Sequence, residues 1–340
     1  MEEHQLTSGP LLDNKGNLAE AGFAFSLIKD YQRKAIRGLK TRIKEWDYYY
    51  VGNKDYGVAF TVADNSYMWM VSASFLDFKN KIDTTTSPLG FFSFGKLKMP
   101  STSKIGNVFF KRKKFLFSFK HENNKRHLIV HLDKFGKNED PFDADLTLEE
   151  TNHDSMVIAT PFNKKKHFYY NQKINLLKAS GVVRIASKTY NFNDAYGVLD
   201  WGRGIWTYKN TWYWSSMNTI QNGQRIGWNL GYGFGDTSKA SENMFFYHDK
   251  AYKLKDVRFN IPEKNGKFDY LSPWTITSLS GDINIIFKPV LDRFSDSNVL
   301  LIRSYQHQVF GLFTGNIKIH GEEVYIENAP GFAERVYNRW

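Results

Sequence analysis

The alternation of apolar and polar side chains predicts that this chain is built from short antiparallel β-strands. Two series of strand-like runs, at residues 41–135 and 181–329, are rich in β-branched and aromatic residues and end at Gly, Asn, Asp or Pro. In Phe115–Phe119 every second residue is Phe, which places these rings on one face of a strand. Regular short strands joined by tight turns indicate an antiparallel meander that forms a barrel or a sandwich.

The two series of strands predict two consecutive β-rich domains. The boundary that the pattern favours lies in the polar segment 161–180, although no internal sequence repeat is visible. We therefore expect an N-terminal leader at 1–20, a first barrel-like domain at 21–178 and a second at 179–340. The last residue, Trp340, is expected to close the end of a barrel.

The composition supports a globular β-protein, because 16% of the 340 residues are aromatic and such rings favour the pleated surface of strands. The absence of cysteine excludes disulfides, thiolate metal ligands and cysteine nucleophiles. The N-terminus lacks the apolar segment of a signal peptide, and no apolar run approaches the roughly 18 residues that span a bilayer. We expect a cytoplasmic protein without a membrane span, and the pattern carries no indication of an oligomeric state.

The net charge of +11 raises the question of a nucleic-acid or anionic-membrane partner. The most basic run, Lys111–Lys114, lies between two aromatic strands, so it is expected to be the solvated tip of a hairpin. No RNA-recognition, helix-turn-helix or zinc-finger pattern accompanies it. We therefore expect no nucleic-acid partner.

The stretch at 196–235 is the most distinctive part of the chain. It combines glycines with large rings, a combination expected in the wall of a packed or ligand-filled interior. Five of the nine tryptophans lie in it: Trp201, Trp206, Trp212, Trp214 and Trp228.

Asp200 is the first candidate for chemistry in this stretch. It follows apolar Leu199 and precedes Trp201, so its carboxylate is desolvated unless it is paired. Desolvation favours the protonated form, which would make Asp200 a general acid beside rings that tolerate positive charge. The alternative is structural: a pair between Asp200 and Arg203 that holds a glycine-bearing turn between the domains.

Other residues extend this candidate site. Glu242 would bring a second carboxylate, which would also suit a glycosidase, and Trp46-Asp47-Tyr48 is a carboxylate between rings in the first half. The candidate catalytic residues are Asp200, Arg203 and Glu242, and the candidate ligand-binding residues are Trp46, Asp47, Tyr48, Trp201, Trp206, Trp212, Trp214, Arg225 and Asn243.

No cofactor or metal is expected. The nine histidines form no ligand spacing of the HExxH type, and there is no P-loop, nucleophile elbow or dinucleotide fingerprint. The glycine-rich run Gly231–Gly235 lacks the βαβ context of such a fingerprint, so close strand packing is its expected use.

The strings GVLDWGRGIW, RIGWNLGYGFG, SENMFFYHDKAYKL and the C-terminal VFGLFTGNIKIHGEEVYIENAPGFAERVYNRW resemble the DUF2804 family of uncharacterised bacterial proteins. The resemblance covers residues 5–340. It implies an architecture related to carotenoid 1,2-hydratase and AttH-like proteins, with two lipocalin-type β-barrels side by side. It points to Asp200 as the position to inspect and implies no settled activity.

Three functions are compatible with these residues. The first is binding of an apolar or amphipathic small molecule in a lipocalin-like cavity bounded by the tryptophans. The second is a cofactor-independent hydratase, isomerase or cyclase that uses Asp200 as general acid. The third is binding or hydrolysis of carbohydrate.

Overall fold

The computed structural model describes residues 3–151, 154–299 and 302–339. Within these ranges β-strands dominate, and two short 3₁₀ turns occur at Arg33–Ala35 and Lys40–Arg42. The strands within both large sheets pair in antiparallel fashion. The predicted all-β class with few short helices is confirmed.

The first sheet is formed by strands from the first 205 residues of the chain. Its order is β7-β6-β5-β4-β16-β14-β12-β11-β10-β9, so β16 inserts between β4 and β14. The bounds are β4 Ile43–Gly52, β5 Tyr56–Asp64, β6 Met68–Asp77, β7 Ile82–Thr86, β9 Val108–Arg112, β10 Phe115–Glu122, β11 Lys125–Phe135, β12 Asp140–Glu149, β14 Phe168–Ile185 and β16 Tyr196–Ile205. Shorter strands extend it: β2 Gly22–Ala24, β8 Leu89–Phe91, β13 Met156–Pro161 and β15 Lys188–Asn191, while β1 Gly9–Pro10 and β3 Lys29–Asp30 form a separate parallel pair.

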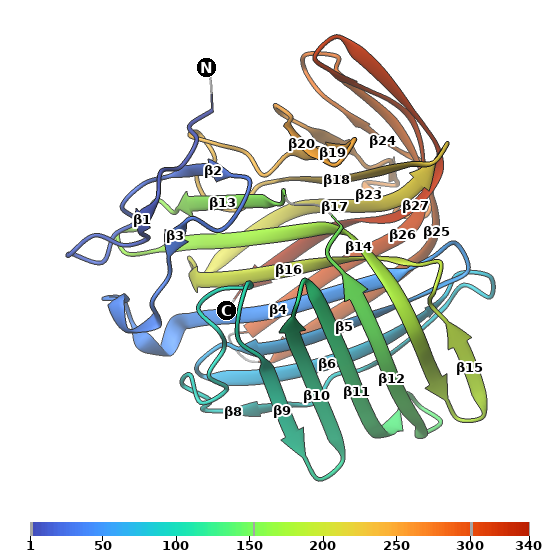
Figure 1. Ribbon diagram of the computed structural model, residues 1–340, viewed down its shortest axis with the longest axis horizontal. Helices are drawn as coiled ribbons and strands as arrows, with labels where there is room; N and C mark the ends of the chain where they lie inside the picture. The colour runs from blue at the N-terminus through green and yellow to red at the C-terminus, as the bar shows by residue number, and fades with distance from the viewer. Residues whose placement is uncertain (1–2, 152–153, 300–301, 340) are drawn as a thin grey trace.

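The first sheet curls around a single apolar core. Figure 1 shows the green strands β10–β12 crossing in front of the blue strands β4–β6. Rings from the two sides meet there: Phe60 and Phe142 lie 6.1 Å apart, and Tyr49 and Phe119 lie 5.1 Å apart. The period-2 placement of these rings is the pattern read from the sequence.

The second sheet has the order β20-β19-β18-β17-β27-β26-β25-β24-β21 and curls around its own core. Trp228 and Phe313, 4.9 Å apart, are at the centre of that core. The bounds are β17 Lys209–Gln221, β18 Gln224–Tyr232, β19 Met244–Tyr247, β20 Lys250–Lys253, β21 Arg258–Asn260, β24 Trp274–Thr277, β25 Ile283–Val299, β26 Ile302–Ile319 and β27 Glu322–Arg339. A small hairpin, β22 Glu263–Lys264 and β23 Lys267–Phe268, stands apart.

The two curled sheets pack against each other through their outer faces. Tyr50 and Val198 of the first sheet form one buried cluster with Phe310 and Phe332 of the second. The Tyr50 and Phe332 rings are 5.4 Å apart. Figure 1 shows β14 and β16 next to β17, where this contact continues. The arrangement confirms two consecutive antiparallel, lipocalin-like β units.

The chain passes from one sheet to the other between Ile205, the end of β16, and Lys209, the start of β17. The sequence-based boundary between residues 178 and 179 falls inside β14, whose pairing with β12 continues across that position. We therefore propose that the boundary lies at 206–208. The expectation for Trp340 concerns a residue outside those described.

The basic run Lys111–Lys114 forms the exposed tip of the hairpin between β9 and β10, as expected: its first two residues end β9 and the last two form the turn. Among the described residues, no helix has the length and apolar character that crossing a membrane requires.

Candidate functional site

Strand β16 presents its two faces to different environments. Because side chains alternate along a strand, Trp201 and Arg203 point into the first core and Asp200 points to the other side. The second sheet packs on that side, where Lys173, a partner of Asp200, contacts Trp214. The alternation of side chains along β16 thus separates Asp200 from Arg203, which the sequence analysis had placed in one candidate site.

Asp200 is paired with Lys173 of the neighbouring strand β14. Lys173 Nζ lies 2.7 Å from one carboxylate oxygen, and Asn171 Nδ2 donates to the other at 2.6 Å. The same ammonium lies 3.6 Å from the centre of the Trp214 ring on β17. Both partners of Asp200 donate to it, so both of its carboxylate oxygens act as hydrogen-bond acceptors.

Arg203 is fully buried on the opposite face and joins β16 to β4. It donates to Asp47 Oδ1 at 3.0 Å and to the carbonyl of Trp46 at 2.6 Å. Burial raises the pKa of Asp47, and the Arg203 guanidinium opposes that rise. In the described structure Asp200 and Arg203 therefore belong to two separate ion pairs. The Asp200–Arg203 pair, which was the structural alternative for Asp200, is not formed, because residues three apart on a strand face opposite ways.

A wall of aromatic rings lies beside Asp200 and is built from both sheets. Trp46 stacks on Tyr169 at 5.7 Å and meets Trp206 edge-on at 4.9 Å. Phe234 packs on Trp206 at 4.9 Å, and Trp212 lies 5.1 Å from Phe234. Trp46 and Trp212 remain partly exposed, so solvent reaches this wall.

Gly202 makes the position of Trp46 possible. A Cβ atom on residue 202 would lie 1.9 Å from the Trp46 ring, far inside van der Waals contact. Gly231 has a similar role, since a Cβ atom there would lie 2.6 Å from Glu242 Oε1. The glycines of this stretch therefore leave room for a ring and for a carboxylate.

Glu334 of β27 is a buried carboxylate in the same region. Trp212 Nε1 donates to one of its oxygens at 3.0 Å, and Gln308 Nε2 donates to the other at 3.1 Å. Gln308 also donates to the Tyr48 hydroxyl at 3.1 Å, which connects Glu334 to the first sheet. Burial raises the pKa of Glu334 to about 7. This group can both hold and release a proton near neutral pH.

Glu242 is half-buried on the other side of Trp214. Asn229 Nδ2 donates to Glu242 at 3.1 Å, and Asn229 Oδ1 accepts from Trp214 Nε1 at 2.7 Å. Burial raises the pKa of Glu242, and nearby Lys173 opposes the rise. The pKa values of Glu242 and Glu334 both respond to the charges of Lys173 and Asp200.

We call these four ionisable groups and the rings around them the inter-sheet site. Its ionisable members are Lys173, Asp200, Glu242 and Glu334, and its rings are Trp46, Tyr48, Tyr169, Trp206, Trp212, Trp214 and Phe234. Tyr48 belongs to it because its ring lies 6.1 Å from that of Trp214.

Several residues expected at the site lie elsewhere. Trp201 is fully buried in the first core, where Arg203 and Asp47 also lie. Arg225 pairs with Asp249 and donates to the carbonyl of Thr151. Asn243 has a structural role: its side chain accepts from the Gly231 N–H and donates to the Lys255 carbonyl, both at 2.7 Å.

Sequence reasoning missed Lys173 and Glu334. Lys173 lies in the segment interpreted as a domain boundary, yet Tyr169, Asn171 and Lys173 are alternate residues on one face of β14. Glu334 follows Phe332 on the same face of β27. The available signal was the period of two, which puts Lys173 on the same face as Tyr169 and Asn171 and Glu334 on the same face as Phe332.

The site offers hydrogen-bonding groups, the Lys173–Asp200 ion pair and one carboxyl group, Glu334, whose pKa is about 7. Within the described residues, no group of three or more His, Asp or Glu side chains is placed to hold a metal ion. The available chemistry is therefore that of side-chain proton transfer and of polar recognition against a ring-lined wall.

Solved structures resemble this chain at low sequence identity. An AttH-type protein from Nitrosomonas europaea aligns with a TM-score of 0.52 and 11% identity over 90% of this chain and 95% of its own. Kievitone hydratase from Nectria haematococca aligns with a TM-score of 0.49 and 12% identity, over 87% of this chain and 88% of its own. At this identity the first similarity bears on the fold alone.

No curated protein matches the chain by sequence. The profile of a domain family of unknown function matches nearly its whole length, residues 2–340. The chain belongs to the DUF2804 family.

Proposed function

We propose that the inter-sheet site binds an amphipathic small molecule. The observation that carries the proposal is a ring-lined wall, shared by both sheets, against which one ammonium and three carboxylates are held. Rings supply apolar contact area, and a few fixed polar groups orient a ligand, which is the usual composition of a small-molecule site. Partly exposed Trp46 and Trp212 are the points where the ligand makes contact.

The charges favour a ligand with hydroxyl or amine donors over a purely apolar one. Asp200 has its charge balanced by Lys173, whereas Glu242 and Glu334 receive their hydrogen bonds from neutral amides and an indole. These two carboxyl groups retain acceptor capacity for a donor on the ligand. The aromatic face beside them suits the apolar part of the same molecule.

The test is to extract the purified protein and to identify bound molecules by mass spectrometry. We expect an amphipathic molecule from the wild type and its loss from Trp212→Ala, because Trp212 touches both Phe234 and Glu334. Trp69→Ala is the matched control, a partly buried tryptophan that packs on Phe110 in the first sheet. A wild-type protein that yields no bound molecule, or equal retention by both variants, contradicts the proposal.

A second candidate function is proton transfer to the bound molecule, as in a cofactor-independent hydratase, isomerase or cyclase. The titration of Glu334 near pH 7 favours it, and makes Glu334 the proposed acid in place of Asp200. When the protein is incubated with the extracted molecule, we expect a product whose mass is larger by one water, or an isomer that separates from the starting molecule by chromatography. Glu334→Gln should abolish that product while the molecule still binds; an unchanged rate in this variant excludes Glu334 as the acid.

A further inference from the structure

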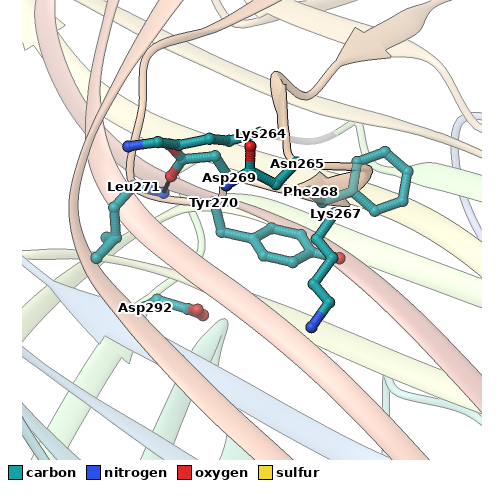
Figure 2. Close-up of a pocket in the computed structure, with 8 residues that line it drawn as sticks. All are labelled: Lys264, Asn265, Lys267, Phe268, Asp269, Tyr270, Leu271 and Asp292. Atoms are coloured by element: carbon teal, nitrogen blue, oxygen red, sulfur yellow. Dashed lines mark hydrogen bonds between the residues drawn. The ribbon is translucent and has the colours of Figure 1, made fainter.

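A second cluster of chemistry-bearing side chains lies at one end of the second sheet, away from the inter-sheet site. A cavity of about 570 Å³ is lined by the segment Lys264–Leu271 and by Asp292 of β25. Figure 2 shows the side chains of this segment on one side and Asp292 coming from the facing strand. The cavity therefore lies between a loop and the inner face of the curled sheet.

Asp292, which lines the cavity, is held by a hydrogen-bonded pair of side chains behind it. His307 Nδ1 lies 2.7 Å from Asp292 Oδ2, and His307 Nε2 lies 3.1 Å from the Tyr305 hydroxyl. With Nδ1 protonated, His307 donates to Asp292 and accepts from Tyr305. The second oxygen, Asp292 Oδ1, is buried and has no hydrogen-bond partner among the described residues.

An unpaired carboxylate oxygen at the end of a cavity is a strong hydrogen-bond acceptor. Leaving it unpaired costs free energy, and a ligand that brings an O–H or N–H group removes that cost. The group that fits Asp292 Oδ1 is therefore a donor. His307 holds the other oxygen and so fixes the direction in which the free one points.

The walls of the cavity are built to meet a flat ring. Phe268 and Tyr270 are the rings that line it. Tyr270 is stacked on His307, with ring centres 3.7 Å apart and planes 12° apart, and His307 also stacks on Phe294 at 4.6 Å. Phe268 and Leu271 are exposed at the rim. Aromatic side chains in these positions give offset or edge contacts to a further ring.

The rim carries positive charge. Lys264 and Lys267 are exposed and line the cavity. The Asp269 carboxylate keeps its negative charge and accepts from Ser272 Oγ at 2.8 Å within its own loop. Lys264 and Lys267 are the cationic side chains at the opening, and an anionic group on the ligand can pair with them.

We propose that this cavity is a second ligand site, which takes a small phenolic carboxylate. The phenol O–H donates to Asp292 Oδ1, the ring lies against Tyr270 and Phe268, and the carboxylate lies near Lys264 and Lys267. This proposal does not depend on the inter-sheet site, since Asp292 and His307 face the inside of the second sheet while Gln308 faces the first.

The experiment is titration calorimetry of the full chain with 4-hydroxyphenylacetate. We expect saturable binding by the wild type, and binding at least tenfold weaker to phenylacetate, which lacks the donor, and to 2-(4-hydroxyphenyl)ethanol, which lacks the carboxylate. Equal affinity for all three compounds, or the absence of saturable binding, would overturn the proposal.

Variants assign the binding to this cavity. Asp292→Asn and the surface variant Lys267→Glu should each weaken 4-hydroxyphenylacetate about tenfold. Lys79→Glu, an exposed lysine in the β6–β7 turn, makes the same charge change elsewhere and should leave the affinity unchanged. Glu334→Gln should also leave it unchanged. Loss of binding in Glu334→Gln, or full binding in both Asp292→Asn and Lys267→Glu, would place the compound elsewhere and refute the proposal.

Discussion

The carboxylates of the inter-sheet site differ in the partners that surround them. Asp200 faces an ammonium at 2.7 Å, whereas Glu334 is buried among an indole and an amide. Burial stabilises the neutral form of Glu334 and outweighs the opposing charges of Lys173 and Arg293, so the pKa of Glu334 rises. The raised pKa makes Glu334 the proposed proton donor of this site.

The raised pKa of Glu334 predicts a pH dependence of stability. Its pKa is about 7 in the folded chain against an ordinary 4.5, so between these values the folded state retains a proton that the unfolded chain has lost. The free energy of unfolding therefore falls as pH rises through this window, by about 3 kcal/mol for this group. Below pH 4.5 both states hold the proton and the contribution is constant.

Urea unfolding at a series of pH values checks this expectation. The difference in unfolding free energy between wild type and Glu334→Gln should shift in favour of the variant between pH 4.5 and 7. Glu149→Gln, an exposed carboxylate on β12, is the control and should follow the wild-type curve. Parallel curves for wild type and Glu334→Gln would show that Glu334 titrates normally.

At the scale of one element, β16 is the strand on which the first sheet and the inter-sheet site both depend. It pairs with β4 on one side and β14 on the other. One face carries Trp201 and Arg203 into the core, and the other carries Asp200 and Gly202. The small residue on the second face is what allows the Trp46 ring of β4 to lie across the strand.

Substitution Gly202→Ala is predicted to displace Trp46. The added methyl group would meet the ring at 1.9 Å, and overpacking of this kind costs about 1–3 kcal/mol of unfolding free energy. Chemical denaturation measures the loss. In a Trp46→Ala background the same substitution should cost much less, since the clashing ring is gone. An equal cost in both backgrounds would mean that the glycine is needed for its backbone and not for the ring.

At the scale of the whole molecule, the two β units share several buried clusters. Met156 and Leu176 of the first unit pack with Met244 and Phe246 of the second, in addition to the cluster around Tyr50 and Phe332. Apolar surface shared in this way would be exposed if either unit unfolded alone. The interface therefore couples the stability of the two units.

We predict that the chain unfolds in a single cooperative transition. Calorimetry should give one peak with equal calorimetric and van't Hoff enthalpies, and denaturant curves followed by circular dichroism and by tryptophan fluorescence should coincide. Phe332→Ala, which removes a ring from the shared cluster, should separate the transition into two. Two peaks in the wild type would show instead that the units are energetically independent.

The sequence determined the local structure and the neighbourhood of the site. Period-2 runs such as Phe115–Phe119 dictated strands, and the basic run Lys111–Lys114 dictated an exposed hairpin tip. The rings and glycines of 196–235 indicated close packing of rings on backbone, and in the structure the Trp46 ring lies against Gly202. The alternation of side chains along a strand also determines that Asp200 and Arg203, three residues apart, lie on opposite faces.

Tertiary structure decided the partners. Lys173 meets Asp200 because β14 pairs with β16, and Glu334 meets Trp212 because β27, the last strand, pairs with β17. Strand order in a sheet depends on contacts between distant segments, whose free energies sum over the whole molecule, so no local pattern encodes it. For the same reason, the point at which the chain passes from the first sheet to the second, after β16, follows from the strand order and not from a local pattern. Local alternation determines which way a side chain points; the fold determines what it meets there.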